Sequence, residues 1–288
     1  MFFQAIGSLA REVEPVSGDA QSAKGGIALT IEGVSKTYSG RAGDVEALRP
    51  VDMEVAAGEF VCLLGPSGCG KSTLLNIGSG LYSPSEGAAF VDGERVQGPN
   101  AHVAFMLQKD LLLPWRTVLE NVMFGVEIQR LALPERRRRA HALLENFNLA
   151  EFAGHYPHQL SGGMRQRVAL ARTLAVDPSV LLLDEPFSAV DAQTRMVLQH
   201  ELAQTLKRAG KTALLITHDL LEAVTLSDRV LVMSRRPGRI IDEICVELPQ
   251  RDDPIARRHV PQVNDYVARL MDRLDIGDAG QYAAGALA

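Results

Sequence analysis

The sequence has few cysteines and no long hydrophobic run. Three cysteines occur in 288 residues, and their spacing matches neither a disulfide framework nor a set of metal ligands. No apolar run reaches the roughly 20 residues that a membrane-spanning helix needs. Residues 1–6 lack a basic leader and a sufficient apolar core, so we expect no secretory signal. These absences favour a globular protein that works in a reducing compartment.

The sequence also lacks a strong excess of charge of either sign. It holds 35 acidic and 30 basic residues, with a net charge of −5. This balance gives no reason to expect a nucleic-acid partner. Hydrophobic residues make up 46% and charged residues 23%, which suits a folded protein with a substantial core. The length predicts one large domain, or one domain with a subdomain.

One glycine-rich stretch organises the rest of the sequence. It lies between a strand-like apolar run, residues 60–64, and a run with helix character, residues 74–77. Its spacing is that of a phosphate-binding loop, in which a glycine is followed after an interval by glycine, lysine and serine. The stretch consists of Gly65, Pro66, Ser67, Gly68, Cys69, Gly70, Lys71, Ser72 and Thr73.

The residue types in this phosphate loop suit a nucleoside triphosphate. Glycines let the backbone turn its N–H groups inward, and the helix that begins near Lys71 adds the positive end of its dipole. The Lys71 ammonium can reach the β- and γ-phosphates, and the Ser72 hydroxyl can hold Mg²⁺. Because Cys69 lies inside the loop near a helix N-terminus, we expect alkylation of its thiol to block nucleotide binding.

Two acids end a second buried strand. The apolar run 180–183 leads into Asp184 and Glu185. A carboxylate at such a strand end, beside a phosphate loop, holds Mg²⁺ directly or through water, which we expect of Asp184. Glu185 is placed to accept a proton from the attacking water. A later apolar strand, residues 212–217, ends at His218, which can bond the γ-phosphate.

A second helix start offers another anion site. Ser161 is a natural N-cap, and the two glycines after it leave backbone N–H groups uncovered. Apolar residues then recur on one helical face from Met164 to Ala175. Taken alone, an ordinary glycine-containing cap explains this pattern equally well.

Two further positions each have two interpretations. Tyr38 can stack on a nucleotide base, or it can be a half-buried strand residue. After Gln108, residues 111–115 place apolar side chains and the only tryptophan in a loop-like setting. That loop can be a docking patch for a partner or a locally buried segment.

Together, in this order, these motifs resemble the ATP-binding-cassette (ABC) ATPase family. The resemblance covers about residues 27–250, and its most specific part is the sequence LSGGMRQR at residues 160–167. Other phosphate-loop NTPases lack that signature. The fold implied is α/β: a phosphate-loop NTPase core with a mixed sheet and flanking helices, an antiparallel β subdomain and an α-helical signature subdomain at about residues 109–178.

The resemblance also implies a role for each motif, with ATP and Mg²⁺ as ligands. The catalytic residues implied are Glu185 as general base, His218 as switch histidine, Lys71 and Gln108. Mg²⁺ binding is implied for Ser72, Gln108 and Asp184. The nucleotide-binding residues implied are Tyr38, the phosphate loop from Gly65 to Thr73, Ser161, Gly162, Gly163, Gln166 and Asp191.

In this family the signature binds the γ-phosphate of ATP held by the opposite subunit, and the loop at Asp191 communicates across the dimer. An ATP has one γ-phosphate, so two distant anion sites on one chain are both used only when two chains face each other head to tail. We therefore expect a symmetric dimer of this chain with two shared sites.

The remaining segments are expected to be simpler. Residues 1–26 are rich in small and charged residues and are expected to form a flexible tail. The ATPase domain is expected to span residues 27–250, with a strand pair within residues 45–55. Residues 251–288 are expected to form a C-terminal helix, within 260–274, and a tail.

Two stretches, residues 111–122 and 234–241, are similar to the importer subgroup for nitrate, sulfonates and taurine. This similarity implies the ATP-hydrolysing subunit of a binding-protein-dependent importer for a small anion. It implies a membrane permease docking near Leu111–Trp115, an external solute-binding protein, and a peripheral position on the cytoplasmic face of the cell membrane. The alternatives are an importer for another solute, such as a pyrimidine precursor, or a soluble cassette ATPase acting on ribosomes or DNA. The latter predicts two cassettes, a coiled insert or a basic arm, and the sequence has none of these.

Overall fold

The computed structural model describes residues 26–40 and 43–274. The predicted N-terminal tail, apart from Gly26, and the chain after residue 274 lie outside the described residues. In the described part, the strands form a four-stranded sheet in the order β2-β1-β4-β5 and a six-stranded sheet in the order β10-β9-β3-β8-β7-β6. The strands are β1 (Ile27–Gly40), β2 (Gly43–Ala56), β3 (Phe60–Leu64), β4 (Glu86–Val91), β5 (Glu94–Arg95), β6 (Val103–Met106), β7 (Val180–Asp184), β8 (Thr212–Thr217), β9 (Arg229–Met233) and β10 (Ile240–Cys245).

The four-stranded sheet is antiparallel throughout. The sequence suggests a strand pair within residues 45–55, and this is wrong: β2 is one long strand that pairs with β1 along its length. Buried and exposed side chains alternate in the second half of β2, which is the pattern of a strand with one face on a core.

The six-stranded sheet is parallel except for its edge strand β10, which runs antiparallel to β9. All residues of β3 and β8 are buried. Strands covered on both faces consist of continuous apolar residues rather than alternating ones, which explains the runs seen in the sequence. The phosphate loop follows β3 at the carboxyl edge of this sheet, where ligands bind in parallel α/β folds.

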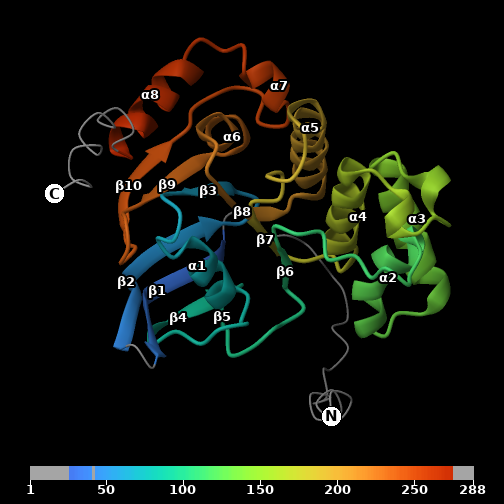
Figure 1. Ribbon diagram of the computed structural model, residues 1–288, viewed down its shortest axis with the longest axis horizontal. Coiled ribbons are helices and arrows are strands. Elements are labelled where there is room, and N and C mark those ends of the chain that lie inside the picture. Colours follow the sequence, from blue (N-terminus) through green and yellow to red (C-terminus); the bar gives the residue numbers. More distant parts are fainter. Residues whose placement is uncertain (1–25, 41–42, 275–288) are drawn as a thin grey trace, which may run out of the picture.

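Helices cover both faces of the parallel sheet (Figure 1). They are α1 (Lys71–Gly78), α2 (Val118–Ile128), α3 (Leu133–Asn146), α4 (Gly162–Ala175), α5 (Ala192–Ala209), α6 (Leu220–Leu226), α7 (Pro254–Arg257) and α8 (Val263–Arg273), with short 3-10 turns η1 (Ala150–Phe152) and η2 (Pro157–Gln159). Helices α2, α3 and α4 form a separate group at one side of the molecule. The helix expected within residues 260–274 is α8.

Strand β7 separates α1 from α4. Its residues Val180 and Leu182 pack in a core with α1 and the antiparallel sheet, whereas Leu181 and Leu183 pack in a core with α2, α4 and α5. Neighbouring residues of a strand point to opposite faces, so the two helices lie on opposite faces of the sheet. In Figure 1 the strands β6 and β7 lie between α1 and α4.

No helix within residues 26–40 and 43–274 is both long and apolar enough to cross a membrane.

Candidate active site

The phosphate loop needs its glycines for steric reasons. Gly70 has φ 107°, and a Cβ there would lie 2.5 Å from Leu48 Cδ2 and 3.0 Å from the Ala47 carbonyl oxygen. A Cβ on Gly65 would lie 3.0 Å from Met233 Cβ. Gly70 caps α1 without a side chain, which leaves the first N–H groups of the helix free of a side-chain acceptor. The loop is thus an anion cradle pressed against the two sheets.

Lys71 lies within this cradle and is only 7% exposed. Its ammonium donates to the carbonyl oxygens of Gly65 at 2.7 Å and Pro66 at 2.9 Å, and it lies 3.9 Å from Cys69 Sγ. The charge is therefore held at the centre of the loop. The thiol of Cys69 is itself buried, so an alkylating reagent reaches it only if the loop opens.

Asp184 ends β7 beside the start of α1. Burial raises the pKa of its carboxyl, and a hydrogen bond from the exposed Ser72 hydroxyl and the charge of Lys71 oppose that shift. A hydroxyl and a carboxylate side by side are hard oxygen donors, which suit Mg²⁺ when phosphate oxygens complete its shell. The donor set therefore fits the expected ion.

Glu185 adopts a backbone conformation that is uncommon for its residue type, with φ 46°. Its N–H donates to the Ile216 carbonyl at 3.0 Å, and its own carbonyl accepts from the Ser188 N–H and hydroxyl. Its carboxylate Oε2 lies 3.2 Å from Nδ1 of His218, which is mostly exposed. The two predicted catalytic residues therefore face each other, held by a backbone conformation of the kind that clusters at functional sites.

Gln108 joins the same turn. Its Nε2 donates to the Ser188 hydroxyl at 3.2 Å, and Ser188 in turn donates to the Glu185 carbonyl. The segment that follows β6 is thereby linked to Glu185 by two hydrogen bonds. Ser188 could not be predicted from the sequence, because a serine in an acidic turn carries no distinguishing signal.

Tyr38 lies beside the phosphate-loop helix. Its hydroxyl is 3.3 Å from Thr73 Oγ1, the residue is 38% exposed, and the Tyr82 ring meets its ring edge-on with centroids 6.4 Å apart. Tyr38 is a residue of strand β1, as the strand interpretation expects, and part of its surface is open to solvent. An exposed ring beside a phosphate site is available to stack on a base.

The signature is a second helix N-terminus, with Ser161 as the N-cap of α4 accepting from the Met164 N–H at 3.3 Å. Ser161 and Gly162 are exposed, so this end of the helix faces outward. Gly163 packs against α5, because a Cβ there would lie 2.4 Å from Thr194 Cγ2. The Thr194 N–H donates to Asp191 at 3.0 Å, which brings the predicted Asp191 to the same surface.

Gln166 lies elsewhere. It is 3% exposed, and its amide donates to the carbonyl oxygen of Pro186 within the same chain. This side chain therefore ties the signature helix to the turn after Glu185, and it does not lie on the outward surface with Ser161. The helical spacing of the signature did not reveal this, because position along a helix does not say what the facing surface contains.

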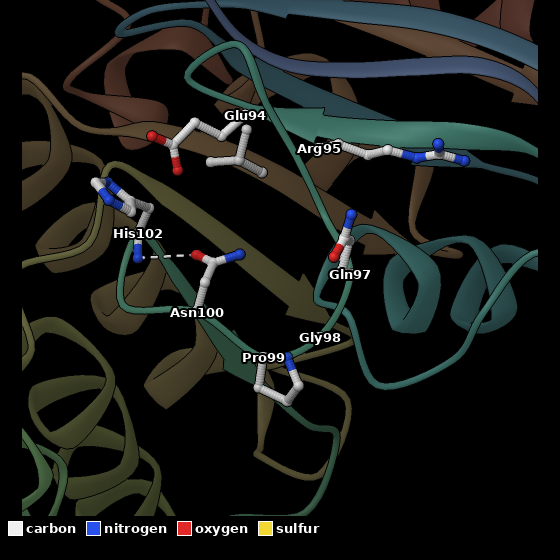
Figure 2. A pocket seen from close by; sticks show the side chains of 8 residues that line it. Glu94, Arg95, Gln97, Gly98, Pro99, Asn100 and His102 are labelled. Atoms are coloured by element: carbon white, nitrogen blue, oxygen red, sulfur yellow. Dashed lines mark hydrogen bonds between the residues drawn. The ribbon is translucent and has the colours of Figure 1, made fainter. Parts of the chain in front are cut away.

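A separate hollow of about 220 Å³ is lined by residues between the end of β4 and the start of β6. Figure 2 shows Glu94, Arg95, Asn100 and His102 around it, with the His102 N–H donating to the Asn100 side chain at 2.9 Å. None of the predicted site residues lines it.

Comparison with known proteins agrees with this geometry. The profile described as ABC transporter matches residues 48–188. An uncharacterised ABC transporter ATP-binding protein of Methanocaldococcus jannaschii is 46% identical over 79% of this chain and 85% of its own length. The chain belongs to the ABC transporter family. Its site is therefore an ATP-hydrolysing site of that family.

Members with named solutes are similarly related. The taurine import ATP-binding protein TauB of Yersinia pestis is 44% identical over 85% of this chain and 95% of its own length. The nitrate import ATP-binding protein NrtD of Synechocystis is 45% identical over 77% of this chain and 83% of its own length. A solved dimeric ATP-binding cassette, bound to ADP and Pi in a post-hydrolysis state, superimposes with a TM-score of 0.68 at 34% identity, covering 76% of this chain and 99% of the other.

Proposed function

We propose that the chain is the ATP-hydrolysing subunit of an importer for a small anion, with taurine, another sulfonate and nitrate as the leading candidates. The similarity to TauB and NrtD supports the solute class. In the proposed arrangement the chain lies peripherally on the cytoplasmic face of the cell membrane. A membrane permease binds it, and an external binding protein delivers the solute.

The observation that carries the permease proposal is an exposed apolar segment after Gln108. Trp115 is 71% exposed and Leu111 is 54% exposed, whereas Leu112 between them is buried. Large exposed apolar side chains that lie together mark interaction sites. A groove of about 270 Å³ adjoins the segment, lined in part by Leu107, Leu111 and Phe124.

This segment is rigidly built, as a docking surface requires. The Asn121 side chain is fully buried and bonds the segment at four points: it accepts from the Leu113 N–H and donates to the carbonyl oxygens of Leu113, Arg116 and Thr117. This role of Asn121 could not be predicted from the sequence, because an asparagine within a predicted helix does not stand out. Ordered backbone lowers the entropy cost of binding a partner.

The signature helix holds the same segment. Arg172 of α4 donates to the carbonyl oxygens of Asp110 at 2.6 Å and Leu111 at 2.9 Å, and Arg165 donates to the Asp110 carboxylate at 3.1 Å. A displacement of α4 is therefore passed to the docking segment. This connection supports a mechanism in which closure of two chains around ATP moves the bound permease.

Two copies are proposed to form the ATP-bound state. The outward-facing signature and the phosphate loop lie on opposite faces of β7, so a signature completes the site of a second copy rather than its own. The solved relative is dimeric, which supports this arrangement. ATP then holds the dimer together, and hydrolysis loosens it.

Each residue then has a defined role in hydrolysis. Ser72, Asp184 and Gln108 would hold Mg²⁺, which would supply positive charge beside the phosphate oxygens. Lys71 and the loop N–H groups bind the phosphates, and Glu185 accepts a proton from the attacking water. His218 donates a hydrogen bond toward the γ-phosphate while its other nitrogen faces Glu185.

The test uses a tagged Glu185→Gln variant, which is expected to bind ATP without turnover and to persist as a dimer. It is purified with ATP from solubilised native membranes, and the associated proteins are identified by mass spectrometry. A permease with several membrane spans is expected. Ribosomal or DNA-repair proteins instead would refute the importer.

A second variant makes the test specific to the docking segment. Trp115→Glu in the Glu185→Gln background is expected to keep ATP-dependent dimerisation and to lose the permease. For the solute, the captured wild-type complex is placed in liposomes with its binding protein. Stimulation of ATPase activity by taurine or nitrate is expected, and stimulation only by an uncharged solute would refute the anion proposal.

A further inference from the structure

The turn that carries His218 is held by hydrogen bonds to one hydroxyl group, that of Thr217. The Asp219 N–H donates to Thr217 Oγ1 at 3.0 Å, and the same hydroxyl donates to the Glu222 carboxylate. Asp219 also caps α6 by accepting the Glu222 N–H at 3.0 Å. These bonds fix the backbone on both sides of His218.

Glu222 has no role in the mechanism described above, and yet it is 4% exposed. Burial raises the pKa of its carboxyl, and hydrogen bonds from Thr217 and Gln199 oppose that shift. A buried carboxyl is costly unless it is well bonded, and both of its oxygens are engaged here: the second accepts from Gln199 Nε2 at 2.8 Å. Because burying this carboxyl costs free energy and both of its oxygens accept hydrogen bonds, we expect it to serve a function.

The network continues from Gln199 to the C-terminal segment, residues 249–274. Gln199 is 1% exposed, and its Oε1 accepts from Arg258 Nη2 at 3.0 Å. The neighbouring Arg257 is also buried, and it anchors the segment by donating to the carbonyl oxygens of Pro249, Leu248, Thr225 and Ser227. Figure 1 shows α7 and α8 lying over α5 and α6.

A second link from α5 acts on the same turn. Arg195 Nη1 lies 3.6 Å from Asp219 Oδ2, and its Nη2 donates to the Val190 carbonyl at 3.2 Å. Helix α5 thus holds the turn of His218 at two points, through Arg195 and through Gln199. Helix α5 therefore supports the turn, and the exposed His218 ring faces Glu185.

We propose that Glu222 is a positioning residue for His218. By holding Thr217 on one side and Gln199 on the other, it keeps the His218 ring facing Glu185, and it makes the C-terminal segment part of the support of the active site. The inference rests on the proposed function only in that the reaction is ATP hydrolysis. Because Glu222 acts through His218 and does not touch the phosphate loop, its loss lowers turnover and leaves ATP capture unchanged.

The first experiment is a double-mutant cycle on Mg-ATP hydrolysis by the full chain. Glu222→Ala is expected to lower kcat by about 10- to 100-fold, with KM for ATP within about twofold of wild type. Adding Glu222→Ala to His218→Ala is expected to cause little further loss, because the group it positions is gone. Losses that multiply in the double variant would overturn the proposal, as would a rise in KM alone.

Two more variants separate positioning from general damage. Glu222→Gln keeps a buried polar group between Thr217 and Gln199 and is expected to recover most of the lost kcat. Glu247→Ala removes an exposed carboxyl and is expected to change nothing. If Glu222→Ala does not fold, Thr217→Val removes the same link from the other side, and its kcat is expected to fall in the same way. Unchanged kcat in Thr217→Val would overturn the proposal.

A spectroscopic measurement decides the question without relying on activity. The ring signals of His218 among the seven histidines are followed by NMR of ¹³C-histidine-labelled protein. Glu222→Ala is expected to shift the His218 signals and leave those of distant histidines unchanged. Unchanged His218 signals would refute the positioning role, whereas a wild-type chain that does not hydrolyse ATP would refute the proposed function instead.

Discussion

The two helix N-termini that bear phosphate-binding features, those of α1 and α4, differ in where the fold places them. The start of α1 is packed between two sheets, with a buried lysine and a glycine that tolerates no side chain. The start of α4 is exposed and is capped by a serine. Both offer backbone N–H groups to an anion, but only the first is enclosed by its own chain.

This difference predicts different roles for the two sites. A buried site binds its ligand through groups that one chain supplies, so its variants change affinity in the isolated chain. An exposed site gains strength only when a second surface excludes water from it, so its variants change assembly and turnover. The predictions below test this division, from the largest effect to the smallest.

The largest effect is expected for Lys71→Ala. The substitution removes the ammonium at the centre of the loop and leaves the Gly65 and Pro66 carbonyl oxygens without their donor. ATP affinity of the isolated chain and kcat/KM are expected to fall by roughly 100-fold or more. Equilibrium binding of a fluorescent ATP analogue and steady-state ATPase assays measure both. Lys207→Ala, at an exposed lysine, serves as the control; equal losses in the two variants would contradict the prediction.

The same substitution at one glycine of each site sharpens the comparison. Gly70→Ala forces a Cβ onto Leu48 and the Ala47 backbone at a positive φ, and it is expected to cost about 1–3 kcal/mol of stability and to weaken ATP binding. Gly163→Ala meets only the methyl group of Thr194 and is expected to keep ATP affinity while lowering turnover about tenfold. Urea unfolding and the two ATP assays distinguish the outcomes.

A compensating variant tests the cause of the second effect. Thr194→Ser removes the methyl group that a Cβ on Gly163 would meet, and the double variant is expected to recover most of the turnover. If Gly163→Ala lost ATP affinity in the isolated chain, the signature would be contributing to its own chain's site. The expected division, in which only the α1 site sets the affinity of the isolated chain, would then be wrong.

A smaller effect is expected for Tyr38→Ala. Loss of an exposed ring that stacks on a base weakens binding by about 1 kcal/mol, or roughly three- to tenfold in ATP affinity. Tyr38→Phe keeps the ring and loses only the contact with Thr73, so its affinity is expected to stay near wild type. Calorimetric titration with ATP measures both variants. A loss as large in Tyr38→Phe as in Tyr38→Ala would show that the hydroxyl contact matters more than the ring.

The smallest effect is expected on the pH dependence of stability, through two carboxyl groups whose pKa values are shifted in opposite directions. The Thr194 N–H lowers the pKa of exposed Asp191, so its stabilisation is present above its unfolded pKa and is lost as the pH falls through its folded pKa. Burial raises the pKa of Glu222, so its contribution is complete below its unfolded pKa and is lost as the pH rises through its folded pKa.

Substitution of these groups is therefore expected to change Tm in opposite directions with pH. Between about pH 2.5 and pH 8, relative to wild type, Tm of Asp191→Asn is expected to fall as the pH rises toward about 4, and Tm of Glu222→Gln is expected to rise as the pH increases above about 4. Differential scanning calorimetry over this range measures the two slopes. Parallel slopes would show that burial does not distinguish these two carboxyl groups.

Local sequence was sufficient to predict the elements that bear the motifs. The phosphate loop lies between a strand and a helix as expected, and Asp184 and His218 lie at strand ends as expected. These predictions succeed because glycine spacing, apolar runs and caps act over a few residues. The strand pair expected within residues 45–55 failed, because the pairing partner that extends β2 to a single strand is distant in sequence.

The sequence by itself determined the chemistry of this protein: an anion cradle with its lysine, the acids at strand ends, and a second capped helix start. Only the tertiary structure decided how these groups are oriented. It buried Gln166 against Pro186, placed α1 and α4 on opposite faces of one sheet, and enclosed Glu222 behind His218. The physical reason is that residue type determines what a side chain can bind, whereas burial and partners depend on which distant segments pack against it.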